Sequence, residues 1–149
     1  AEPDYRPNAL ARALRSSRTH SLGLIVPDVT NPFFGELAKQ IEQVAAGMGY
    51  TVMLANSNDD PKAEAEYIKV LVGRQVDGLL IVPSEETRQL PHEAKVPMVV
   101  VDRPIRGYPL VASDHRGGAV AAVQHLVSLG HRRIGCIAGA RHLSVARER

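Results

Sequence analysis

The stretch LGLIVPDVTNPFF, residues 22–34, holds the strand-to-helix transition that decides the fold of this chain. It begins with residues 22–26, a continuous apolar run without polar alternation. Such a run is typical of a parallel strand that is covered on both faces. Asn31 then offers a helix N-cap, and Pro32 favours the first helical position. The stretch therefore predicts a buried strand that leads into a helix.

The same alternation continues along the chain. Four further apolar runs occupy residues 51–55, 78–82, 98–101 and 134–138. Apolar spacings of three and four predict helices after Pro32, after Pro61 and around residues 120–127, and Gly49 and Gly130 stand where helices should end. With a short helix before the fourth strand, this order predicts a doubly wound parallel sheet of the α/β class.

Polar residues follow the predicted strands at the points where these strands end. The residues after the first four runs are Asp28 and Asn31, Asn56, Ser84, and Asp102 with Arg103. Ligands of open α/β sheets bind outside the carboxyl ends of the strands, so this edge is a candidate binding site. Polar loops after strands are also a general property of such folds, so the pattern alone favours neither explanation.

Composition limits the functions that the chain supports. Its 149 residues, 44% of them hydrophobic, suit one domain with a core. The net charge of +2 is too small for a general nucleic-acid coat, but residues 6–18 hold four arginines and no acid, which fits contact with phosphates at one end. Because neither metal-ligand spacings nor a P-loop, G-x-G-x-x-G or G-x-S-x-G motif occurs, we expect no metal, no cofactor and no enzymatic activity.

The cellular location follows from two further features. Cys136 is the single cysteine, which excludes an internal disulfide and fits a reducing compartment. No apolar stretch approaches the roughly 18 residues of a membrane helix, and the N-terminus lacks an apolar signal core. We therefore expect a cytoplasmic protein with no membrane partner, although the mature form of an exported protein would look the same.

The most specific motif is YRPNALARAL, residues 5–14. It predicts a short helix that starts at a proline and places Leu10 and Leu14 on one face. An ordinary amphipathic leader helix would explain this pattern, and so short a helix is marginal alone. Its amino-acid sequence, however, closely resembles the hinge helix of the lactose/galactose-repressor family of transcriptional regulators. In that family, the hinge helix links a helix-turn-helix headpiece to a sensor core.

This resemblance implies that the chain contacts operator DNA. The matching residues of the hinge are Asn8, Leu10, Ala11, Arg12, Leu14 and Arg15. Leu14 matches the leucine that wedges between base pairs in the minor groove and bends the duplex. Arg12 and Arg15 would then lie near phosphates or the groove edge. We therefore expect residues 1–20 to form the hinge helix and linker of a homodimer.

The resemblance extends into the sensor core, which the family shares with ribose-type periplasmic binding proteins. It implies that Asn31, Phe33 and Phe34 contact a sugar. The amide of Asn31 would form hydrogen bonds with sugar hydroxyls, and the two phenylalanine rings would pack on C–H surfaces of the sugar. The two rings could instead belong to the core, but neighbouring helix positions cannot both face the sheet. Asp102 and Arg103 match a second sugar-contacting pair, for which an ordinary surface ion pair is the alternative.

Two more effector contacts rest on the same resemblance. Asp114 lies in a segment where the family usually has Asp-Asn, and His115 departs from that pattern. Arg149 aligns with the family's effector-contacting arginine. Because the family's proteins are longer, we expect residues 21–149 to be the first lobe of the effector-binding core, with the headpiece and the second lobe absent.

The sequence thus predicts a sequence-specific DNA-binding transcriptional repressor whose core binds a small-molecule effector, a sugar. The alternative is a periplasmic sugar-binding protein that serves a transporter, against which the hinge segment argues. The residues identify neither the effector nor the operator, and they do not distinguish an inducer from a corepressor.

Overall fold

The computed structural model describes residues 18–91 and 96–137. Its elements are β1 (Ser21–Val26), α2 (Pro32–Gly47), β2 (Thr51–Asn56), α3 (Pro61–Gly73), β3 (Gly78–Ile81), β4 (Met98–Val101), β5 (Leu110–Val111) and α4 (His115–Ser128). None of the helices in these two ranges is long and apolar enough to cross a membrane. Several predicted site residues lie outside the described residues, namely Asn8, Leu10, Ala11, Arg12, Leu14, Arg15 and Arg149.

The five strands form one parallel sheet in the order β2-β1-β3-β4-β5. In this register Leu24 of β1 lies beside Leu54 of β2 on one side and Leu80 of β3 on the other. The chain therefore runs from β1 to one edge and then returns to build the other side of the sheet. This change of direction is the mark of a doubly wound sheet and confirms the predicted α/β class.

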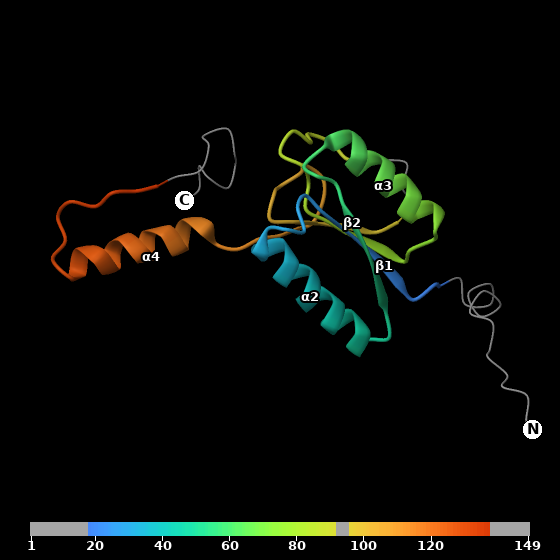
Figure 1. Cartoon of the computed structure of the whole chain (residues 1–149), viewed down its shortest axis with the longest axis horizontal. Coiled ribbons are helices and arrows are strands. Elements are labelled where there is room, and N and C mark those ends of the chain that lie inside the picture. The colour runs from blue at the N-terminus through green and yellow to red at the C-terminus, as the bar shows by residue number, and fades with distance from the viewer. Residues whose placement is uncertain (1–17, 92–95, 138–149) are drawn as a thin grey trace, which may run out of the picture.

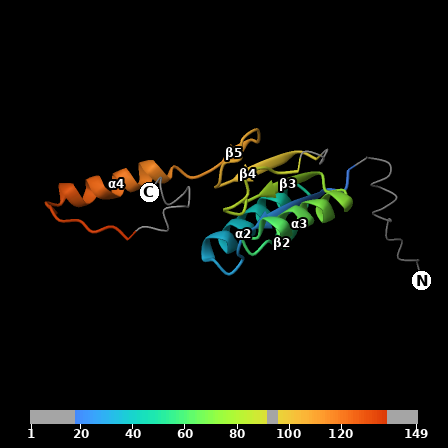
Figure 2. The ribbon, with the colours of Figure 1, turned by 90° about the horizontal axis from the view of Figure 1, so that it is seen from above.

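Helices α2 and α3 cover opposite faces of the sheet, as Figures 1 and 2 show. On one face, Ile25 of β1 belongs to a buried cluster with Ile68 and Leu71 of α3. On the other face, Leu24 of β1 shares a buried cluster with Phe34 of α2. Because successive strand residues point to opposite faces, both kinds of position in β1 must be apolar. This explains why the run at residues 22–26 does not alternate.

A glycine in the middle of β1 brings α3 close to the sheet. A Cβ atom at Gly23 would overlap the Cδ2 atom of Leu79 and lie 2.9 Å from the Cδ1 atom of Leu71. The absence of a side chain at this position therefore creates the space that these two leucines fill. Strand glycines often mark such close approaches.

The helix ends follow the sequence signals. Asn31 caps α2 by accepting a hydrogen bond from the Phe33 N–H at 3.0 Å, and Asp60 caps α3 in the same way. Gly49 and Gly130 adopt φ angles of +79° and +89° just after α2 and α4, a conformation that costs glycine little. The predicted starts and stops are confirmed.

The segment before β1 is fastened to the loop before β3. The Asp77 carboxylate accepts hydrogen bonds from the backbone N–H groups of Thr19 and His20, at 2.9 and 3.0 Å, and from the Thr19 hydroxyl. Burial opposes ionisation of this carboxyl, but the hydrogen bonds outweigh burial and lower the pKa of Asp77. Asp77 thus anchors the point at which the chain enters the sheet.

Two expectations about the second half of the fold are corrected, and a third is confirmed. The described residues between β3 and β4 hold a turn at Glu85 and Glu86 instead of a short helix. The fifth strand is Leu110–Val111, and residues 134–137 of the run predicted as a strand are exposed and form none. The α4 helix is present, but it has no buried residue and extends away from α2 and α3 (Figure 1).

The fate of the predicted last strand and the position of α4 have a common physical reason. A helix between two parallel strands packs on the sheet because both strands hold it there. Here β5 occupies the edge beside β4, and only Leu110 and Val111 form its ladder. So short an edge strand offers little backbone for a further neighbour. The described part of that run, residues 134–137, therefore forms no strand, and α4 is not returned to the sheet.

Candidate functional site

The loops that follow β1, β2, β3 and β4 meet at the carboxyl edge of the sheet, as the parallel topology requires. At the start of α2, Phe34 is 6% exposed and belongs to the same buried cluster as Val101, the last residue of β4. Phe33 is 47% exposed, and its ring packs edge-to-face on Phe34 with centroids 5.2 Å apart. The expectation that only one of the two rings faces the sheet is confirmed.

The loop after β1 is ordered by its own side chains. The Asn56 side-chain oxygen accepts from the backbone N–H of Val29 and ties this loop to the end of β2. Asp28 accepts from the hydroxyl and the N–H of Thr30, and the hydroxyl bond is the main cause of the lowered pKa of Asp28. Asn31 caps α2 through its oxygen, which leaves its amide NH₂ group to donate.

Arg103 joins three loops of this edge. Its Nη1 atom donates to Oδ1 of Asp59 at 2.7 Å and to the carbonyl oxygen of Pro83 at 2.8 Å. Its Nη2 atom lies 3.6 Å from a carboxylate oxygen of Glu85, and the Arg103 side chain is only 17% exposed. Within the described part of the chain, Arg103 therefore pairs with acids of neighbouring loops, Asp59 and Glu85.

Asp102 has a different partner. Its Oδ1 atom lies 2.9 Å from Nε2 of His115, the first residue of α4, and the two side chains are 10% and 8% exposed. Asp102 has a φ of +65°, which is uncommon for a residue with a side chain. The backbone is held there by its N–H, which donates to the carbonyl of Val111 at 2.9 Å. The structure thus brings Asp102, Arg103 and His115 to one edge, but as two separate pairs.

Asp114 acts locally in the described structure. Its carboxylate caps α4 by accepting from the backbone N–H of Gly117 at 2.8 Å. The side chain is exposed. A contact of Asp114 with an effector stays a prediction.

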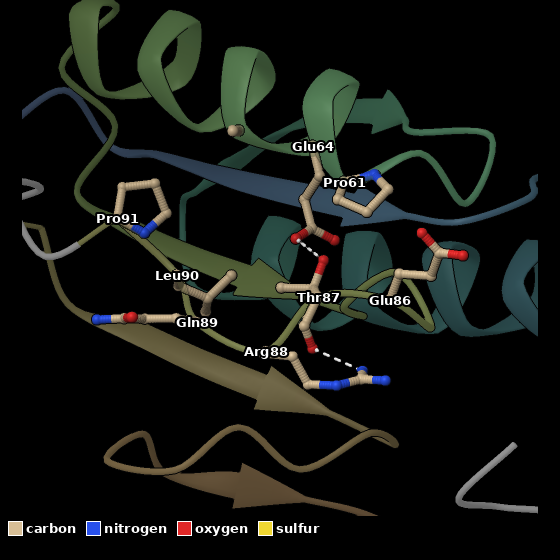
Figure 3. A pocket seen from close by; sticks show the side chains of 9 residues that line it. Pro61, Glu64, Glu86, Thr87, Arg88, Gln89, Leu90 and Pro91 are labelled. Carbon is tan, nitrogen blue, oxygen red and sulfur yellow. Dashed lines mark hydrogen bonds between the residues drawn. The ribbon is translucent and has the colours of Figure 1, made fainter. Parts of the chain in front are cut away.

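Beside this edge lies a buried carboxylate that the sequence did not single out. Glu64 of α3 is 2% exposed and accepts from the N–H and hydroxyl of Ser84, at 2.6 and 3.0 Å, and from the hydroxyl of Thr87 at 2.8 Å. Figure 3 shows Glu64 pointing from α3 toward Thr87. The available signal was spacing, because residues 64, 68 and 71 share the helix face that packs on the sheet. An acid on that face requires polar partners.

Glu64 positions the loop that holds two partners of Arg103, Pro83 and Glu85. Ser84 directly follows Pro83, whose carbonyl accepts from Arg103. A cleft opens next to Glu64, between the start of α3 and residues 86–91 (Figure 3). Asp102 and Arg103 do not line this cleft. The pairs Asp102–His115 and Arg103–Asp59 lie at the edge of the sheet and not in the cleft, so the edge is the stronger candidate ligand site.

Fold and edge together place the chain among proteins built on a doubly wound parallel α/β sheet. The family model for periplasmic binding proteins and the sugar binding domain of the LacI family matches residues 19–149. The chain belongs to this family.

Individual relatives agree with this assignment. The ribose operon repressor of Halalkalibacterium halodurans is 37% identical over 153 residues, which cover 99% of this chain and 45% of the repressor. Among solved structures, this chain resembles a periplasmic binding protein/LacI transcriptional regulator from Alkaliphilus metalliredigens, which was solved in complex with D-xylulofuranose. The two superimpose with a TM-score of 0.77 at 31% identity, and the match covers 87% of this chain and 48% of the regulator. The Cra transcriptional dual regulator from Pseudomonas putida, in complex with fructose 1-phosphate, gives 0.70 at 29% identity, with coverages of 87% and 50%.

The chain spans about half the length of each of these relatives. The three are described as regulators or repressors, and none is described as an enzyme.

Proposed function

We propose that the chain is the first lobe of the sugar-sensing core of a cytoplasmic transcriptional repressor, which acts on operator DNA as a homodimer. The observation that carries this proposal is the carboxyl edge of the sheet, where Asp102 pairs with His115 and Arg103 pairs with Asp59, and where the Asp102 and Arg103 side chains are only 10% and 17% exposed. Buried charges held by hydrogen bonds at the end of parallel strands are suited to recognise hydroxyl groups.

Each side chain of the edge has a distinct role in this proposal. One oxygen of Asp102 accepts from His115, and the second accepts a sugar hydroxyl. The N–H groups of Arg103 that Asp59 and Pro83 do not use donate to a neighbouring sugar oxygen. The exposed ring of Phe33 packs on the C–H face of the sugar, supported from beneath by Phe34, and the Asn31 amide donates to a further hydroxyl.

The DNA-binding part of the proposal rests on residues 5–15. Their resemblance to a hinge helix, with Leu14 as the minor-groove wedge, favours a regulator over a sugar carrier of a transporter. The relative named as a ribose operon repressor supports the same choice. We propose that effector binding changes the affinity of this segment for DNA, as in other two-state regulators.

The test is calorimetric titration of the full-length protein with D-ribose, D-xylulose and fructose 1-phosphate. At least one of these sugars should bind, and Asp102→Asn should weaken that binding by about tenfold or more. Glu66→Gln is the matched control, because it removes one exposed carboxylate on the outer side of α3 and should change nothing. If no sugar binds, or if Asp102→Asn binds as well as the wild type, the proposed site is wrong.

A second experiment separates the regulator from the transport protein. Selection of duplexes from a random DNA pool by the full-length protein should return a pseudo-palindromic sequence. Recovery of no preferred sequence would favour the sugar carrier.

A further inference from the structure

We infer that His115 is a positioning residue of the sugar site, and that sugar recognition by this protein depends on a hydrogen bond from its ring to Asp102. This inference rests on the proposed function, because it concerns the same site. The observation behind it is the contact of 2.9 Å between Nε2 of His115 and Oδ1 of Asp102. A carboxylate has no proton to give, so the His115 ring is the donor.

Because of the environment of Asp102, its carboxylate depends on the hydrogen bond from His115. Its side chain is 10% exposed, so water supplies little of the hydrogen bonding that a buried carboxylate requires. The neighbouring cation, Arg103, is directed to Asp59 and Pro83 instead. The orientation of the Asp102 carboxylate is therefore set by His115 on one side and by its own backbone on the other.

That backbone is already fixed. The Asp102 N–H donates to Val111, and the Arg103 N–H donates to the carbonyl of Val101 across a tight turn. With the backbone held, rotation of the side chain is the remaining freedom of Asp102. The hydrogen bond from His115 to Oδ1 restricts this rotation and leaves Oδ2 as the oxygen that we assign to the sugar hydroxyl. A group that orients a ligand-binding carboxylate in this way fixes which sugar hydroxyl the carboxylate accepts.

Position on α4 explains how His115 reaches Asp102. His115 is the first residue of the helix, directly after the capping residue Asp114, and its side chain is 8% exposed. No described residue of α4 is classed as buried. The contact therefore lies where the sheet passes into a helix that the core does not hold, and it joins the two at the binding edge.

The inference is tested in the full-length protein with three substitutions. His115→Phe keeps the ring and removes the donor, and His115→Gln retains an N–H donor of similar reach. His125→Phe is the matched control, because it makes the same change on the same helix at an exposed position. Calorimetry is performed with D-ribose and with its 2-deoxy and 3-deoxy analogues, and Asp102→Asn identifies the hydroxyl that depends on Asp102.

His115→Phe should weaken D-ribose binding by about tenfold or more. It should also abolish the preference for D-ribose over the analogue that lacks the hydroxyl bound by Asp102. His115→Gln should restore most of the affinity and preference, and His125→Phe should resemble the wild type. If His115→Phe loses the same factor in affinity for all three sugars, the role of His115 is merely structural and the inference is overturned. The inference is also overturned if His115→Phe keeps the preference for D-ribose, or if the wild-type protein binds all three sugars equally well.

A second measurement needs no substitution at position 115. In the histidine ¹H–¹⁵N spectrum of the wild-type protein, saturating D-ribose should move the ring resonances of His115 and leave those of His125 in place. Unmoved His115 resonances in a sugar-bound protein would overturn the inference alone. If the wild type binds no sugar at all, the proposed function fails, and the inference fails with it.

Discussion

Removing the Glu64 carboxylate is expected to destabilise the protein by about 3 kcal/mol or more, because three neutral donors lose their common acceptor. The structure indicates where this cost arises. Glu64 accepts three hydrogen bonds, from the Ser84 N–H, the Ser84 hydroxyl and the Thr87 hydroxyl, and it is 2% exposed. Glu64→Ala leaves these donors without their acceptor, and each buried unsatisfied donor costs about 1–3 kcal/mol. The missing side-chain volume adds a cavity.

Two further variants divide this cost into its parts. Glu64→Met keeps most of the volume and removes the acceptor, so it should retain most of the loss. Glu64→Gln keeps one acceptor oxygen without the charge and should cost about 1–2 kcal/mol, since charge-assisted bonds are stronger than neutral ones by about this amount. Glu66→Ala is the control on the same helix, because Glu66 is exposed and its pairing with Lys69 should contribute less than about 0.5 kcal/mol.

The assay is urea denaturation of each variant, followed by far-UV circular dichroism at neutral pH. A loss below about 1 kcal/mol in both Glu64→Ala and Glu64→Met would refute the idea that this network holds the loop after β3. A large loss in Glu64→Ala together with a small one in Glu64→Met would assign the effect to packing.

Three other outcomes are expected. Because hydrogen bonds lower the pKa of Asp77, this residue should contribute stability above the pKa of an unfolded aspartate and lose the contribution as the pH falls through its lowered value. Asp77→Asn should therefore reduce the urea midpoint at pH 7, and the reduction should shrink as the pH falls below the range in which an unfolded aspartate titrates. Gly23→Ala should lower the melting temperature, because the new Cβ atom is forced against Leu79 at a cost of about 1–3 kcal/mol. Gly47→Ala is the control and should not lower the melting temperature, because its Cβ atom meets no atom within 4 Å. Leu14→Ala in the full-length protein should weaken binding to the selected operator and leave sugar binding unchanged, and unaltered operator affinity would contradict the wedge.

The candidate site shows which features could be predicted from the sequence and which could not. Asp102 and Arg103 were predicted from the end of an apolar run and from a resemblance, and both lie at the carboxyl edge. Their partners were not predicted. Asp59 lies 44 residues from Arg103 along the chain, and the contact depends on the order in which the sheet places the loops after β2 and β4. No local pattern carries such a pairing.

The sequence by itself determined the alternation of strands and helices, the caps of α2 and α3, and the doubly wound class. These features depend on residues that are close along the chain, because a continuous apolar run, an N-cap and a terminal glycine act within one or two turns. The tertiary structure alone decided that Leu110–Val111 forms the last strand and that residues 134–137 do not. Edge pairing is a competition between segments for one row of backbone groups, and the spacing of apolar residues contains no information on which segment occupies that row.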